Sequence, residues 1–324
     1  MTSSTRARLV SACLSILSLP CLATAQDTRS TLTLLVDDSS VIVQARVLQV
    51  QTDGITRRVT FKTRQVLKGT SPATFELREP FQRSCGSALF GTLVGTSYVT
   101  FLTGEGSNLR LTVTTARALM PLAPKTLRHI RTLVSTKNSQ RRLALAVAGL
   151  ASTSTRIRQD SAATLARAKL LTQLNRSERW QCLQALGKNL RGEDRVTLDL
   201  LQVVRRLKMK EAVDLLVPHY LTEPTGTLRN VLLETIPELD KSRAVRRLEQ
   251  SMPSDIQGLK RGITLLSLCD DTAARRCLDQ LSTHRNQVVA AMAQAARLET
   301  AGLQTKRASF KKPIFRSILQ PKRR

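Results

Sequence analysis

The residues whose types and spacing come nearest to metal chemistry are two cysteines and a histidine in the C-terminal half. Cys269, Cys277 and His284 follow one another with seven and six residues between them. Thiolate and imidazole bind zinc, but a closed zinc site needs a fourth ligand. The neighbouring Asp270 and Asp271 are unusual zinc ligands and fit turn or helix-cap positions better. We therefore interpret the cluster as buried structural cysteines beside a surface histidine, and we expect no metal and no cofactor.

The two cysteines of this cluster could instead be oxidised to a disulfide. Cys269 ends one expected helix and Cys277 lies about two turns into the next, so a helix hairpin can bring the sulfurs together. Export would supply the oxidant. The expected mature chain keeps Cys85, Cys182, Cys269 and Cys277, which allow three pairings. A Cys269–Cys277 disulfide is our prediction, and two separate buried thiols are the alternative.

The motifs of common enzyme classes are missing from the sequence. It contains no Gly-x-Ser-x-Gly, no phosphate-binding Gly-rich loop ending in Lys-Ser/Thr and no His-Glu-x-x-His. The three histidines are scattered at positions 129, 219 and 284. We therefore expect a protein that is not an enzyme, with no catalytic residues and no small-molecule substrate.

Positive charge is the strongest signal in the composition. The 324 residues include 51 Lys plus Arg against 24 Asp plus Glu, a formal net charge of +27. Aromatic residues make up only 3% of the chain, with Trp180 as the one tryptophan, which argues against carbohydrate recognition and stacking on nucleic acid bases. The hydrophobic fraction of 41% is that of a folded protein.

The densest positive segment is the C-terminal tail, residues 305–324, with eight basic residues and no acidic one. Pro313 and Pro321 prevent one long helix, so we expect the tail to be disordered in solution. On an anionic surface each cation can contribute about 1 kcal/mol of binding free energy; a solvated tail without a dedicated partner is the alternative. The candidate surface-binding cations are Lys306, Arg307, Lys311, Lys312, Arg316, Lys322, Arg323 and Arg324.

The first 25 residues have the pattern of a secretory signal peptide. Arg6 and Arg8 form a charged start, residues 9–22 an apolar middle, and Ala23-Thr24-Ala25 a small-x-small cleavage site. We therefore expect an exported protein of the periplasm or the extracellular space. Nucleic acid is then not an expected partner.

From Val41 to Arg117 apolar residues alternate with polar ones, the period of half-buried strands. Asp53-Gly54 predicts a hairpin turn and Lys68-Gly69 the end of the next strand. Five strands are expected near residues 41–47, 58–62, 74–78, 97–102 and 109–114. Because such a sheet must bury its apolar face, we predict a small antiparallel β-barrel domain over residues 26–120.

The predicted β-barrel domain contains four short motifs: SVIVQARV at residues 40–47, VLKG at 66–69, SCG at 84–86 and GTSYVTFL at 95–102. Together they resemble the bacterial relatives of the netrin-like domain, the OB-type barrel of the tissue inhibitors of metalloproteinases. The resemblance covers roughly residues 30–118 and implies an OB-type fold. Those inhibitors chelate the protease metal through an N-terminal cysteine, whereas the expected mature chain begins with Gln26. Cys85 is the only cysteine between residues 26 and 181, so the barrel disulfide is also missing.

After Pro121 and Pro124 the apolar period changes from two to 3.6, which is typical of amphipathic helices. Residues 121–137 are expected to form a linker and a first helix. Helix pairs then recur: residues 198–207 with 211–216, 228–239 with 243–248, and 262–268 with 273–278. Leu207, Leu239, Leu268 and Leu298 follow at intervals of 32, 29 and 30 residues. This period predicts an α-solenoid over residues 138–304; a non-repetitive helical bundle is the alternative.

The repeated units resemble HEAT or armadillo-like repeats, most clearly in the Ala-x-x-x-Leu pattern of the second helices, as at Ala244 to Leu248 and Ala274 to Leu278. The resemblance implies a surface for binding rather than for catalysis. The expected fold class is therefore a multidomain α and β chain, in which a small OB/netrin-like barrel precedes an α-solenoid of helix pairs.

These observations leave three hypotheses for function. The first, which we favour, is an exported scaffold that binds a protein partner through the groove of the helical repeats and the β-module. The second is a basic protein that binds anionic envelope surfaces, lipid headgroups or nucleic acid. The third is a protease regulator, by analogy with the metalloproteinase inhibitors.

Overall fold

The computed structural model of this chain describes residues 30–80, 88–113, 117–191, 195–222, 226–269 and 271–306. The expected signal peptide, Cys85 and residues 307–324 lie outside these ranges. The chain divides into two compact units, Met1–Arg167 (unit 1) and Ala168–Arg324 (unit 2). None of the described helices is both long enough and apolar enough to cross a membrane. The domain ranges and the export expected from the sequence stay predictions.

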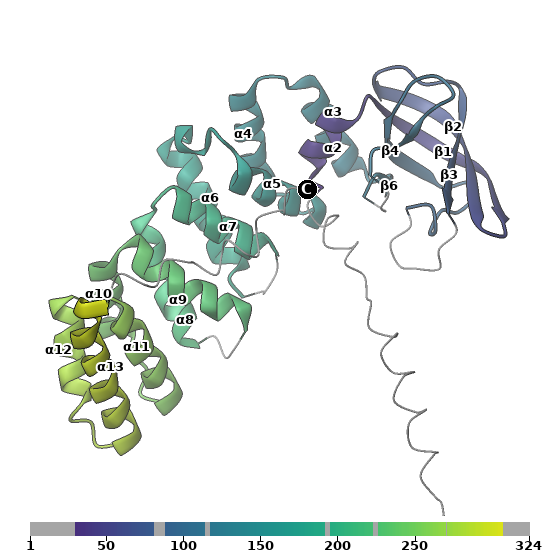
Figure 1. The fold of residues 1–324 in the computed structure, drawn as a ribbon. Coiled ribbons are helices and arrows are strands. Elements are labelled where there is room, and N and C mark those ends of the chain that lie inside the picture. The colour runs from purple at the N-terminus through teal and green to yellow at the C-terminus, as the bar shows by residue number, and fades with distance from the viewer. Residues whose placement is uncertain are drawn as a thin grey trace, which may run out of the picture. The chain divides into compact units, whose positions relative to one another are not determined.

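Unit 1 contains an antiparallel sheet with the strand order β3-β2-β1-β4-β5, and β6 pairs with β4 (Figure 1). The strands are β1 (Val41–Asp53), β2 (Thr56–Lys68), β3 (Thr74–Pro80), β4 (Ser97–Thr103), β5 (Arg110–Leu111) and β6 (Leu119–Pro121). The first four confirm the strands expected from the alternating pattern. The fifth is shorter than expected, and β6 was not predicted.

The turn residues act as the sequence indicated. Gly54, with φ +50°, lies in the hairpin that joins β1 and β2, and Asp53 pairs with Thr56. Gly69, with φ +70°, follows the last residue of β2, and a Cβ there would lie 2.3 Å from the carbonyl oxygen of Ser40. Only glycine therefore allows the chain to leave β2 so close to the start of β1.

The described strands do not close into the barrel that the sequence pattern predicted. β3 and β5 stand at the two ends of the strand order and share no ladder within the described residues. The physical reason is the length of β5, which has only two residues and therefore cannot run along β3. The coarser expectation, an antiparallel sheet followed by many helices, is confirmed.

The sheet buries both of its faces along β1 and β4, which simple alternation did not predict. Val43 and Val47 face one core, together with Phe61, Phe75 and Leu77. Ile42, Val99 and Phe101 face a second core on the opposite side, which is shared with helices. Central strands that are covered on both faces carry apolar residues at successive positions.

Helix α2 (Leu32–Asp38) was not predicted, yet it fills the second core. Leu32, Leu35 and Val36 are fully buried there beside Ile130 and Leu133 of α3 (Pro124–Ser135). The helix begins at Thr31, whose side chain accepts a hydrogen bond from the N–H of Leu34. Unit 1 ends with α4 (Ser139–Gly149) and α5 (Thr155–Arg167).

A buried carboxylate ties α2 to the helices of unit 1. Asp160 of α5 is 4% exposed and accepts hydrogen bonds from the N–H (3.1 Å) and the hydroxyl (3.4 Å) of Thr33. His129 Nε2 of α3 lies 3.7 Å from the same carboxylate. At the C-terminal end of α2, Asp37 forms an ion pair with Arg142 of α4. Three helices that are distant in sequence thus hold α2 in place.

The described residues of unit 2 form helices and no strands, which confirms the helices expected from the 3.6-residue period. They are η1 (Leu171–Gln173), α6 (Arg176–Asn189), α7 (Arg195–Arg206), η2 (Lys210–Ala212), α8 (Val213–Thr222), α9 (Thr227–Leu239), α10 (Lys241–Ser251), α11 (Ile256–Cys269), α12 (Thr272–Leu281) and α13 (Gln287–Lys306) (Figure 1). The helices α7, α9, α11 and α13 pack in one row, and α8, α10 and α12 in a second. Helix hairpins therefore stack in sequence order.

Polar contacts recur between successive hairpins at about the sequence period. Arg205 of α7 binds Glu238 of α9 with two hydrogen bonds of 2.7 Å, and Arg243 of α10 binds Asp214 of α8. Asp271 caps α12 through the N–H of Ala274, so its side chain has the helix-cap role expected for it.

The leucines that marked the period in the sequence do not occupy equivalent sites. Leu239 is buried, whereas Leu268 and Leu298 are exposed. The repetition of helix pairs is present, but these leucines do not define its core.

Replacing Asp160 with alanine is expected to lower the free energy of opening of unit 1 by about 2 to 3 kcal/mol, because the part-buried N–H and hydroxyl of Thr33 both lose their acceptor. Hydrogen exchange of amides in α2 and β1 measures this free energy. Asp53→Ala is the matched control, since the Asp53 side chain is 72% exposed in its pair with Arg58 and its loss should cost less than about 1 kcal/mol. Equal effects of the two variants would contradict the assigned role of Asp160.

Candidate functional site

The candidate binding surface in unit 2 surrounds Trp180, the single tryptophan of the chain. Trp180 of α6 is 55% exposed and lines two neighbouring pockets of about 740 and 700 Å³. We call the residues of both pockets the Trp180 surface: Leu174, Arg176, Arg179, Trp180, Leu183, Gln184, Gly187, Lys188, Leu207, Lys208, Met209, Lys210, Glu211, Asp214, Leu215 and Arg243.

The helical period of α6 explains why Trp180 points outward. Cys182, Leu183 and Leu186 occupy the face that is buried in unit 2. Trp180 and Gln184 lie on another stripe, four residues apart, and both are exposed. The helix begins with a capping box in which Asn175 and Glu178 exchange hydrogen bonds, so the turn before Trp180 is fixed. A large apolar ring is therefore held at the surface by a rigid element.

Charge is unevenly distributed over the Trp180 surface. Its lining contains six cations, Arg176, Arg179, Lys188, Lys208, Lys210 and Arg243, against two carboxylates, Glu211 and Asp214. Asp214 is engaged by Arg243, whose Nε lies 3.0 Å from Asp214 Oδ1. The hydrogen bond from Arg243 lowers the pKa of the Asp214 carboxyl, and the nearby charges of Arg247 and Arg246 lower it further. The surface therefore carries an excess of positive charge.

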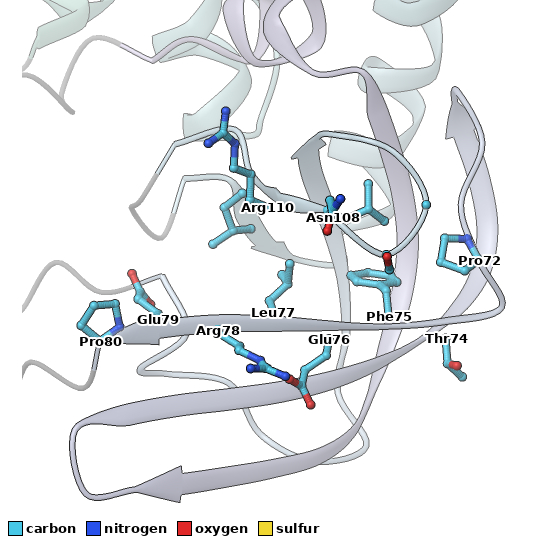
Figure 2. A pocket seen from close by; sticks show the side chains of 14 residues that line it. Pro72, Thr74, Phe75, Glu76, Leu77, Arg78, Glu79, Pro80, Asn108 and Arg110 are labelled. Carbon is cyan, nitrogen blue, oxygen red and sulfur yellow. The ribbon is translucent and has the colours of Figure 1, made fainter.

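A third pocket, of about 990 Å³, lies in unit 1 between β3 and residues 106–111. Phe75 and Leu77 point into it, toward Asn108 and Arg110, whereas Glu76 and Arg78 point away from it and toward each other (Figure 2). The ring of Phe75 stacks on Phe61 with centroids 5.2 Å apart. The pocket thus has an apolar side formed by β3, next to the gap in the sheet.

The cysteines and the histidine singled out in the sequence form no metal centre. Cys269 is buried at the end of α11, and Cys277 is buried in α12, where its Sγ donates a hydrogen bond to Glu249 (3.0 Å). His284 Nδ1 accepts the N–H of Asn286 in the turn before α13. Within the described ranges no three His, Cys, Asp or Glu residues are placed to hold a metal ion.

The structure leaves both cysteines as free thiols, together with Cys182. The Cys269–Cys277 disulfide stays a prediction. Of the eight tail cations, Lys306 is the last residue of α13, and Arg307, Lys311, Lys312, Arg316, Lys322, Arg323 and Arg324 lie outside the described residues.

Sequence reasoning did not identify the Trp180 surface, because η2, α8 and α10 contribute to it from positions 30 to 63 residues away from Trp180. One local signal was available. A tryptophan followed by Gln184 and Lys188 at helical spacing lies on a polar stripe, which predicts exposure.

No protein-family model and no curated protein matches the chain. Among solved structures, the chain is similar to a designed armadillo repeat protein, YIII(Dq)4CqI, with 16% sequence identity over 49% of this chain and 82% of that one. The TM-score of this match is 0.25, which does not establish a shared fold.

Burial predicts that the three described thiols are unreactive while the protein is folded. It raises the pKa of each of Cys182, Cys269 and Cys277 to about 12, so little thiolate forms at pH 8. Iodoacetamide should leave all three unmodified in the folded chain, as measured by peptide mass mapping. Alkylation of any of the three in the folded chain would contradict their burial. In denaturant without reductant, modification of Cys269 and Cys277 shows free thiols, and their continued protection shows the disulfide.

Proposed function

We propose that this chain is an exported, non-catalytic interaction protein whose helical unit binds an acidic segment of a protein partner at the Trp180 surface. The observation that carries the proposal is the position of Trp180, more than half exposed on a rigid helix between two pockets. Tryptophan and arginine are the residues that most often dominate the energy of protein interfaces. Export rests on the signal-like first 25 residues.

The acidic class of partner is inferred from the charges around Trp180. Arg176, Lys188 and Lys208 form no ion pair or hydrogen bond through their side chains with other described residues, whereas Asp214 is already bound by Arg243. An acidic segment crossing Trp180 can place carboxylates near these three cations. Its apolar side chains can enter the pockets beside the ring, where Leu183 lies in both linings. Complementary charge favours such a partner over a basic one.

The finer fold assignments belong to the same proposal. Stacked helix pairs with contacts at about 30 residues support a HEAT or armadillo-like solenoid in unit 2. The antiparallel sheet with the order β3-β2-β1-β4-β5 supports an OB/netrin-like module in unit 1, here with a gap between β3 and β5. Both modules would then serve binding.

The second candidate function is binding to an anionic surface. The formal net charge of +27 favours it, as do the exposed side chains of Arg246, Arg275 and Arg276 on the second helices. The two candidate functions differ in whether binding involves Trp180. An acidic peptide segment must enter the pockets beside this ring, whereas a planar anionic surface need not contact it.

Fluorescence of Trp180 reports on this site alone, since the chain has no other tryptophan. Titrating the full chain with a peptide of repeated Glu-Leu-Glu-Pro units should shift the emission to shorter wavelength as the ring is covered. Arg176→Glu should weaken the affinity about tenfold, because an attraction becomes a repulsion. Arg285→Glu is the matched control, as Arg285 is exposed and remote in sequence from the Trp180 surface.

The counterpart peptide with lysine in place of glutamate should leave the emission unchanged. Equal responses to both peptides, or equal affinities of the two variants, would refute an acidic partner. Saturable cosedimentation with anionic phosphatidylglycerol vesicles, without a peptide response, would favour the surface-binding function instead.

Crosslinking in the producing cells tests whether the partner is a protein. A photoreactive residue in place of Gln184, which lines the pocket beside Trp180, should give a discrete crosslinked protein that is lost when Trp180 is changed to alanine. The same residue in place of Gln280, exposed on α12, is the control and should give none. Identical crosslinks from both positions, or none from Gln184, would contradict the proposed function.

A further inference from the structure

The outer edge of β3 presents backbone groups that its own sheet does not use. In the β2–β3 ladder Phe75 pairs with Phe61 and Leu77 with Val59, and the N–H of Thr63 donates to the carbonyl of Ala73 (2.9 Å). Since bonded positions alternate in an antiparallel pair, residues 73, 75, 77 and 79 direct their N–H and C=O groups toward β2. Thr74, Glu76 and Arg78 therefore direct theirs to the open side, where no described strand pairs with β3.

The side chains along this edge divide into two sets. Thr74, Glu76 and Arg78 are exposed, and Arg78 Nε lies 2.5 Å from Glu76 Oε1. Phe75 and Leu77 face the pocket on the inner side, as Figure 2 shows. An edge strand with free backbone groups is a template for another strand, and charged residues limit which strand can be added.

We propose that β3 pairs with β3 of a second copy of this chain, antiparallel, across a two-fold axis at Leu77. In this register Glu76 of each copy lies opposite Arg78 of the other. Both residues have outward backbone groups, so each pair can exchange N–H···O=C bonds. The side chains of the two pairs lie on the exposed face, where opposite charges directly across the strands are stabilising.

The charges favour this register over its neighbours. A shift of the axis by one residue toward the N-terminus places Glu76 opposite Glu76, and a shift toward the C-terminus places Arg78 opposite Arg78. Like charges directly opposite are destabilising. At the C-terminal end of β3, Pro80 has no N–H to donate, so the ladder between the two copies ends there. The segment Glu76-Leu77-Arg78 is thus complementary to itself and admits its own copy more readily than an unrelated strand.

The pocket of about 990 Å³ lies between β3 and residues 106–111, next to the edge. Leu77 of one copy would stand opposite Leu77 of the other at the axis, while each side chain stays in the core of its own copy. The interface lies in unit 1 and is independent of the Trp180 surface, so the two proposals can fail separately.

The test is the oligomeric state of the full chain by sedimentation equilibrium over a range of concentrations. The wild-type chain should form dimers reversibly. Glu76→Arg should reduce the association constant about tenfold or more, because both cross-strand pairs become repulsive. The double variant Glu76→Arg, Arg78→Glu should restore association, since exchanging the charges recreates both pairs. Glu299→Arg, exposed on α13, is the charge-matched control and should associate like the wild type.

Circular dichroism of each variant confirms that it is folded before its association is compared. A chain that stays monomeric at every concentration overturns the proposal. So does a dimer that Glu76→Arg leaves unchanged, because the edge is then not the interface. Failure of the double variant to recover overturns the proposed register.

Discussion

A carboxylate that is buried must be supplied with hydrogen-bond donors, and this requirement organises unit 1. Asp160 receives the N–H and the hydroxyl of Thr33 and lies 3.7 Å from His129. These contacts fix α2 between the sheet and the helices that follow it, where Leu32 and Leu35 complete the second core. Without α2 the apolar face formed by Ile42 and Phe101 would lose part of its cover. The sheet and its helices are therefore one compact unit.

Unit 2 is stabilised by the packing of successive helix hairpins. Each hairpin buries its apolar face against the next one, and pairs such as Asp214–Arg243 and Glu238–Arg205 fix the contact between neighbours. Side chains that face away from the stacked hairpins do not contribute to the core of unit 2. Trp180 is such a side chain, and its exposure costs hydrophobic stabilisation that a binding partner could recover.

Local periodicity predicted most of the secondary structure, because β1 to β4 and the helices of unit 2 are long enough to show it. It did not predict α2, which has seven residues and shows only one i, i+3, i+4 repeat, formed by Leu32, Leu35 and Val36. Nor did it predict β6, with three residues. Asp160 carries no local signal, since its main partner lies 127 residues away. The Trp180 surface was missed for the same reason: its pockets combine residues from four helical elements.

The contact between Thr33 and Asp160 also sets an order of events during synthesis. Helix α2 is among the first parts of the described chain to leave the ribosome, but its anchor in α5 follows 127 residues later. Until then Leu32, Leu35 and Val36 lack part of their core, and the apolar face of β1 and β4 is incomplete. Such a nascent chain exposes surface that aggregates or is held by chaperones. The last helix of unit 1 therefore determines when its first helix can become native.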